Sequence, residues 1–155
     1  MVTTNARLND RLRRHSQWFL APLEPNTDYT AESKRLQFLD WSNVEDFEGS
    51  AFRRSIGNTA SVRSLIAEDM RGNAERMMLT LAVGAERPLT GQVWFNGQWL
   101  ADLTVRGRAP ERYVIAVPRR LIRTIEYDVL ESNVLEWRGV LDEDARILFW
   151  ALRVQ

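Results

Sequence analysis

Cysteine is absent from the 155-residue chain, and histidine and lysine occur only once each, as His15 and Lys34. Without cysteine there is no disulfide framework, no thiolate nucleophile and no cysteine-based zinc site. The absence is compatible with a reducing cytoplasm but does not establish one. With one histidine, the most common general base of nucleophilic catalysis is available at a single position.

Long apolar runs are missing as well. No stretch approaches the roughly 18 consecutive apolar residues that a membrane-spanning helix needs. Residues 1–22 contain no uninterrupted apolar core of the kind found in a secretory signal peptide. We therefore expect no membrane span and a cytoplasmic location.

The short motifs of common enzymes do not occur. The chain has no G-x-S-x-G elbow, Walker loop, G-x-G-x-x-G turn or H-E-x-x-H helix. His15 lies on the apolar side of a predicted helix, where packing or capping explains it better than catalysis. The run Asp142–Asp144 fits a solvated hairpin tip better than a carboxylate metal site. Since 21 acidic residues allow pairs anywhere, no catalytic carboxylate pair stands out, and we expect a non-enzyme without metal or cofactor.

Charge is balanced overall but unevenly distributed. The 21 basic and 21 acidic side chains give a net charge of zero. Residues 1–20 and 106–123 are basic, whereas residues 24–50 and 126–144 are acidic. Such blocks either pair within the fold or steer a partner, and internal pairing is the favoured interpretation. Domains that bind nucleic acid are usually net basic, so we expect no nucleic-acid partner.

Residues 1–20 are predicted to form a short basic amphipathic helix. Apolar side chains recur at helical spacing, at Leu8, Leu12 and Phe19. The breakers Pro22 and Pro25 then place a linker at residues 21–30. The helix could dock on its own domain, enter a groove of a protein partner, or lie on an anionic membrane surface. Docking on its own domain is favoured, followed by a protein partner.

Residues 31–155 have the pattern of an all-β domain. Short segments with apolar residues at every second position alternate with turn signals, most clearly within residues 76–83 and 112–117. Strands are predicted at 35–41, 51–55, 60–67, 76–83, 91–95, 99–105, 112–117, 133–138 and 146–154. A helical turn is expected after Val117. This spacing predicts a two-sheet antiparallel β-sandwich of jelly-roll type, not alternating βαβ units.

The segment GQVWFNGQWLADL contains the strongest hairpin signal, Asn96-Gly97, because both residues tolerate positive φ. A two-residue turn would pair Trp94 with Trp99 and leave neither face uniformly apolar. A three-residue loop, 96–98, would pair Phe95 with Trp99 and gather the apolar residues on one face. Because register follows the buried face, we predict the three-residue loop, with Trp99 in the core and Trp94 on the outer face.

Three short motifs resemble the second half of a galactose-binding-like jelly roll, the fold of carbohydrate-binding modules. They are Val93-Trp94-Phe95-Asn96-Gly97, Val117-Pro118-Arg119-Arg120-Leu121 and Asn133-Val134-Leu135-Glu136-Trp137. They match the hairpin, strand-end and strand-start patterns of that family across roughly residues 50–155. The basic N-terminal segment is not part of the family's pattern, and no calcium-loop ligand cluster is evident. The resemblance implies a β-sandwich and non-catalytic sugar binding.

Sugar binding requires exposed aromatic rings with polar side chains around them. Of the six tryptophans, Trp94 and Trp41 are the predicted ligand-binding rings, Trp99 and Trp150 fit the core, and Trp137 is undecided. For Trp94, packing under the N-terminal helix is an equal alternative. Predicted polar partners are Arg54, Arg106 and Arg108, each of which could instead form a surface ion pair.

Two functions follow from this pattern. The first is a non-catalytic protein that binds an oligo- or polysaccharide and is accessory to a polysaccharide synthesis or degradation system. The alternative is a protein-assembly module without a small ligand, which forms a homo-oligomer or joins a larger complex through edge strands or the N-terminal helix. The surroundings of Trp94 distinguish them.

Overall fold

The computed structural model describes residues 21–66, 75–124, 132–139 and 146–155. Within these residues the only helical element is a 3-10 turn, η1 (Arg119–Leu121), at the position where a helical turn was expected. None of their helices is long and apolar enough to cross a membrane. The helix predicted for residues 1–20 and the hairpin tip at 142–144 lie outside the described residues.

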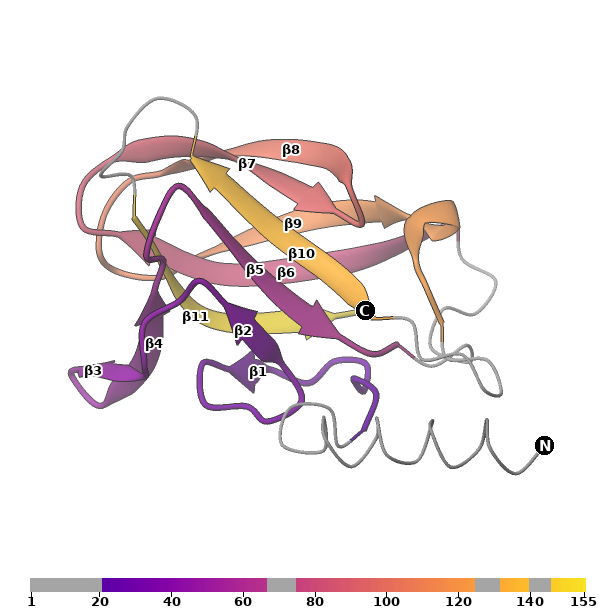
Figure 1. Ribbon diagram of the computed structural model, residues 1–155, viewed down its shortest axis with the longest axis horizontal. Coiled ribbons are helices and arrows are strands. Elements are labelled where there is room, and N and C mark those ends of the chain that lie inside the picture. Colours follow the sequence, from indigo (N-terminus) through magenta and orange to yellow (C-terminus); the bar gives the residue numbers. More distant parts are fainter. Residues whose placement is uncertain (1–20, 67–74, 125–131, 140–145) are drawn as a thin grey trace.

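The described residues form eleven strands in two antiparallel sheets, packed as two layers (Figure 1). The first sheet, the larger one, has the order β3 (Glu45–Phe47), β4 (Ser50–Arg54), β11 (Ile147–Val154), β6 (Arg76–Ala85), β9 (Glu111–Pro118), and β1 (Tyr29–Thr30) also pairs with β11. The second has the order β2 (Gln37–Leu39), β5 (Thr59–Ser64), β10 (Asn133–Gly139), β7 (Leu89–Phe95), β8 (Gln98–Val105). The predicted all-β, two-sheet architecture is confirmed.

All nine predicted strands are present, although β2 is shorter than the expected segment 35–41. The two strands that were not predicted are β1 and β3, which have two and three residues. β1 occupies the last two residues of the expected linker. β3 contains Glu45 and Asp46, whose side chains give no period-two apolar signal, so pairing with β4 and not local propensity makes it a strand.

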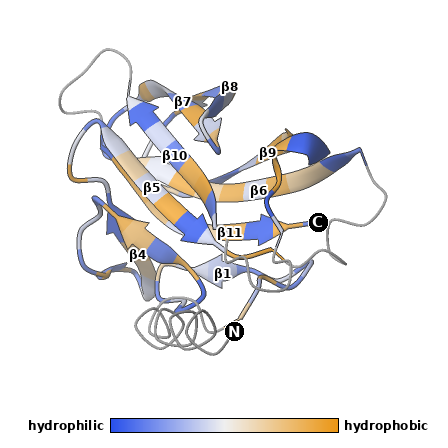
Figure 2. Ribbon diagram, turned by 45° about the vertical axis from the view of Figure 1, so that its right-hand side comes forward, coloured by the Kyte–Doolittle hydropathy of each residue, from blue (hydrophilic) through white to orange (hydrophobic). Residues whose placement is uncertain are grey.

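The main core lies between the sheets and is built from the alternating residues seen in the sequence. Met77, Leu79 and Leu81 of β6 face the same interior as their partners on β9, with Leu79 directly opposite Ile115. Figure 2 shows the alternation of more and less hydrophobic residues along β5, and burial alternates along β10 from Asn133 to Trp137. Each fully buried aliphatic side chain contributes roughly 1.5–3 kcal/mol by removal from water.

A second, smaller apolar cluster lies on the outer face of the larger sheet. The register between β11 and β6 shifts between Phe149 and Ala151, which makes Trp150 the extra residue of a β-bulge. The bulge turns Trp150 away from the main core and onto Phe52, with ring centroids 4.9 Å apart and planes at 27°. Trp150 is therefore buried, as predicted, but on the outer side of its sheet.

Candidate functional site

The β7–β8 hairpin differs from the predicted three-residue loop. Asn96 and Gly97 have φ of 48° and 83°, as in the two-residue turn that matches strand twist, and Trp94 lies opposite Trp99. The register then shifts, so that Val93 lies opposite Ala101 and Leu100 is the extra residue. The apolar residues share one face because of a bulge inside β8, not because of a longer loop.

The bulge leaves Trp99 on the outer face of the second sheet. Its side chain is 48 % exposed, so the prediction of a core position is wrong. Its indole Nε1 donates a hydrogen bond to Asp102 Oδ1 at 3.1 Å. This bond anchors one edge of the ring and leaves much of the remaining ring accessible to solvent.

Trp94 lies beside Trp99 on the same face and is half-buried. The guanidinium carbon of Arg138 lies 3.9 Å from the centroid of the Trp94 ring. Trp94 Nε1 donates to Gln92 Oε1 at 3.1 Å, and Arg138 Nε donates to the carboxylate of Glu136. One face of the Trp94 ring is therefore covered by an arginine, and Trp99 is the more accessible ring.

Trp94, Trp99 and Glu136 belong to one row across the sheet, and Arg138 lies opposite Gln92 in the next row of the same face. The successive cross-strand partners are Leu39, Ser61, Glu136, Trp94 and Trp99, contributed by β2, β5, β10, β7 and β8. At the usual strand spacing of about 4.8 Å the row is about 19 Å long. We call the surface formed by Gln92, Trp94, Trp99, Asp102, Glu136 and Arg138 the tryptophan face. It combines an open aromatic ring with carboxylate acceptors and guanidinium donors.

The other ring predicted to bind a ligand, Trp41, is partly buried and packs against the edge of the main core. Its Nε1 donates to the carbonyl oxygen of Ser61 at 2.9 Å, and its ring makes edge contacts with Phe38 and Phe149. Trp41 is half-buried and lines an interior cavity rather than the tryptophan face. The structure does not bring Trp41 and Trp94 together on one surface.

The three predicted arginines also lie away from the tryptophan face. Arg54 is placed between Glu45 and Glu86, with 3.3 Å from its Nε to Glu45. Arg108 lies 3.8 Å from the same Glu86. These two arginines form ion pairs with acidic residues, as the alternative interpretation of each arginine expected.

Arg106 follows the end of β8 and is exposed. Because Leu89 pairs with Val105 at one end of the β7–β8 hairpin, Arg106 is at the opposite end from the two tryptophans. Burial and the carboxylate of Glu111 raise the pKa of Tyr113, and the positive charge of Arg106 acts in the opposite direction.

Sequence reasoning did not select Glu136 and Arg138 as site residues. The sequence feature that could have identified them is the period-two alternation of β10. Trp137, which the sequence left undecided, points inward together with Leu135, so Glu136 and Arg138 point outward. That Arg138 covers Trp94 depends on the pairing of β10 with β7, which is not visible in either strand alone.

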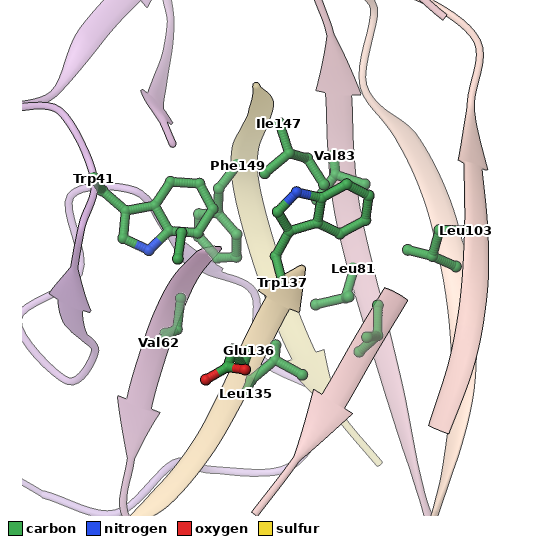
Figure 3. Close-up of a pocket in the computed structure, with 12 residues that line it drawn as sticks. Trp41, Val62, Leu81, Val83, Leu103, Leu135, Glu136, Trp137, Ile147 and Phe149 are labelled. Carbon is green, nitrogen blue, oxygen red and sulfur yellow. The ribbon is translucent and has the colours of Figure 1, made fainter. Parts of the chain in front are cut away.

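The cavity that the described residues enclose between the sheets is too small for a sugar. A cavity of about 30 Å³ lies among apolar side chains that include Leu81, Leu103 and Phe149 (Figure 3). Trp137 is only 5 % exposed, and its Nε1 has no hydrogen-bond partner. The volume is about that needed for one or two waters, and a buried water requires two to four polar partners.

Among the described residues, no three acidic or histidine side chains converge as a metal site would require.

No known protein family matches the sequence, and no curated protein matches it. Solved structures with a similar fold do exist. A family 36 carbohydrate-binding module of a multidomain xylanase from the hindgut metagenome of Trinervitermes trinervoides has a TM-score of 0.53 at 11 % identity, covering 83 % of this chain and 95 % of its own.

Two further carbohydrate-binding modules have the same TM-score of 0.53. A family 35 module from Paenibacillus barcinonensis is 15 % identical over 84 % of this chain and 98 % of its own. A β-1,3-glucan-binding family 6 module from Bacillus halodurans is 12 % identical over 87 % of this chain and 99 % of its own. The resemblance expected from the hairpin and strand motifs is thereby confirmed for the fold.

Proposed function

We propose that this chain is a non-catalytic carbohydrate-binding protein that holds an oligo- or polysaccharide on the tryptophan face. The observation that carries the proposal is the open ring of Trp99, placed outward by the Leu100 bulge beside Trp94 and Asp102, on the face that also carries Glu136 and Arg138. Similar folds occur in proteins described as a xylanase module and a β-1,3-glucan-binding module. We further propose an accessory role in polysaccharide synthesis or degradation.

The chemistry of the tryptophan face suits a sugar. The C–H face of a pyranose packs on an indole ring, while its hydroxyl groups donate to carboxylates and accept from a guanidinium. Trp99 supplies the ring, and Glu136 and Arg138 supply polar groups from neighbouring rows of the same face. We assign Trp94 a further role, because its ring lies 3.9 Å from the guanidinium carbon of Arg138 and so restricts where the donors of Arg138 point.

The test is a titration of intrinsic tryptophan fluorescence with neutral and acidic oligosaccharides, using wild type, Trp99→Ala and Trp94→Ala. We expect Trp99→Ala to weaken binding at least about tenfold, since covering one indole face is worth more than about 1.4 kcal/mol. Trp94→Ala should weaken binding less, by releasing Arg138.

The control is Phe47→Ala, which removes another exposed aromatic ring from the larger sheet. It should bind like wild type. Far-UV circular dichroism checks that each variant folds. If a folded Trp99→Ala protein binds every responding sugar as tightly as wild type does, the tryptophan face is not the site.

The assembly role remains a competing prediction. It was predicted to use edge strands or the predicted N-terminal helix, and residues 1–20 lie outside the described residues. Val114 of β9 is 62 % exposed, but a single exposed valine is ordinary on a monomer surface. Light scattering of the purified protein decides whether it is an oligomer. A cytoplasmic location likewise stays a prediction.

A further inference from the structure

A groove opens on the outer face of the larger sheet, on the opposite side of the sandwich from the tryptophan face. Two short strands, β4 and β1, pair one after the other along the same side of β11. β4 pairs with Leu148 and Phe149, and β1 pairs with Ala151 and Leu152. The bulge residue Trp150 lies at the junction, and the space above it has a volume of about 490 Å³.

The floor of this groove is apolar and recessed. Ala82 and Ala151 lie directly opposite each other on β6 and β11, and their methyl side chains leave a hollow between larger neighbours. Trp150 is 7 % exposed and is held by stacking on Phe52, so its position does not depend on a ligand. The floor is therefore formed before anything binds, which lowers the ordering cost of binding.

The rim is polar and carries both signs of charge. Asp28 accepts two hydrogen bonds of 2.9 Å from Arg153, and Arg112 lies 3.5 Å from it. These two arginines lower the pKa of Asp28 against the opposing effect of burial, so it is a fixed carboxylate. Glu32 and the turn at Gly49–Ser50 complete the rim.

The rim suits an uncharged ligand with many hydroxyl groups. The charges of Asp28 and Glu32 balance those of Arg112 and Arg153, so a strongly charged ligand gains little there. Arg112 is more than half exposed, and its remaining N–H groups are available as donors. An apolar floor, mixed donors and acceptors and a volume within the roughly 300–1,000 Å³ of small-molecule sites are what a sugar ring requires.

We propose that this groove is a second glycan-binding site that takes a neutral mono- or disaccharide unit. The ligand class rests on the proposed function, but the site is separate from the tryptophan face. Since the two sites lie on opposite faces, a short oligosaccharide cannot reach both, whereas separate polysaccharide chains can. The protein is then bivalent and cross-links polysaccharide.

Two tryptophans report on the two sites separately. The indole N–H groups of Trp99 and Trp150 each give one peak in a proton–nitrogen NMR spectrum, assigned by the loss of a peak in Trp99→Phe and Trp150→Phe. Neutral oligosaccharides of two to six units are added to ¹⁵N-labelled full-length protein. We expect the Trp150 peak to shift and saturate with its own dissociation constant, in wild type and equally in Trp99→Phe.

The groove variants are Arg112→Ala and Glu32→Ala, two exposed rim residues whose loss leaves the core intact. We expect each variant to raise the dissociation constant measured from the Trp150 peak at least about tenfold. The dissociation constant measured from the Trp99 peak should stay unchanged. Arg76→Ala is the matched control, an exposed arginine on the same sheet outside the groove, and should change neither response.

The outcomes separate the two proposals. If the Trp99 peak saturates with a sugar while the Trp150 peak stays still, the groove proposal is overturned and the tryptophan face stands. If only the Trp150 peak responds, the groove stands and the tryptophan-face proposal falls. If neither peak moves with any sugar, both are overturned. A Trp150 response that is unchanged in Arg112→Ala and Glu32→Ala also overturns the groove as its source.

Discussion

Gly91 gives the sharpest test of how the core of this sandwich is packed. It lies in the middle of β7, opposite Leu103 on β8 and Gly139 on β10. A Cβ atom added to Gly91 would lie 2.2 Å from both Cη2 and Cζ2 of Trp137 and 2.9 Å from its Cε2. Glycine is therefore required here by the close approach of the indole, not by a turn.

The expected cost of Gly91→Ala follows from that overlap. Non-bonded carbon atoms normally lie about 3.5–4.0 Å apart, so two contacts are too short by more than about 1 Å. Overpacking of a core costs about 1–3 kcal/mol and sometimes more, while alanine gains about 0.5–1 kcal/mol over glycine in a strand. Taking the upper end of that overpacking cost, because the overlap is large, we expect a net loss of about 2 kcal/mol, which lowers Tm by roughly 4–8 °C for a domain of this size.

Trp137→Phe should rescue Gly91→Ala, because it removes the ring atoms that the new methyl group meets. Alone, Trp137→Phe loses packing, but it also removes a buried N–H without a partner, which costs about 1–3 kcal/mol when left unpaired. The two effects oppose each other, so its own change in stability is small. The coupling between the two substitutions should exceed about 1.5 kcal/mol.

The assay is urea unfolding followed by far-UV circular dichroism for wild type, both single variants and the double variant. Gly57→Ala is the control, since a Cβ at Gly57 meets no atom within 4 Å. We expect it to stay within about 0.5 kcal/mol of wild type. Equal stability of Gly91→Ala and Gly57→Ala, or additive effects in the double variant, would refute this account of the packing.

Two further predictions concern polar groups. Asn133 is 1 % exposed, its Oδ1 accepts from the backbone N–H of Arg123 at 2.8 Å and its Nδ2 donates to the carbonyl of Arg123 at 2.8 Å. Asn133→Ala should therefore lower the free energy of unfolding, measured in urea, by about 2–3 kcal/mol. A decrease below about 0.5 kcal/mol would contradict this expectation. The lowered pKa of Asp28 means that its pairing with Arg153 stabilises the fold above the unfolded value near 4 and is lost as pH falls through the folded pKa. Because the pair is partly exposed, this loss of free energy of unfolding is about 1 kcal/mol or less. Thermal unfolding at pH 5 and pH 2 should show this contribution in wild type and not in Asp28→Asn.

Much of the fold could be predicted from short-range pattern. The alternation of Met77, Leu79 and Leu81 decides which side of β6 is buried, because successive side chains of a strand point to opposite faces. Asn96-Gly97 decides the hairpin, since both residues adopt positive φ at little cost. Patterns of this kind involve only a few neighbouring residues, so they can be recognised in the sequence without knowing which strands pair.

The site depended on information that no single strand contains. The apolar pattern around Asn96-Gly97 required one extra residue between the paired strands, but it did not say whether the loop or the strand held it. Pairing across β7 and β8 puts that residue at Leu100, and this alone turns Trp99 outward. A bulge likewise moves Trp150 to the other side of β11.

The surroundings of Trp94 show the same limit. Its ring is covered by Arg138, a residue 44 positions further along the chain that is brought beside it by the pairing of β10 with β7. The sequence by itself determined the strands, their inward faces and the hairpin. Only the tertiary structure decided the bulges and the contacts between distant strands, because these depend on the total burial and hydrogen bonding of the whole sandwich and not on the preference of any one segment.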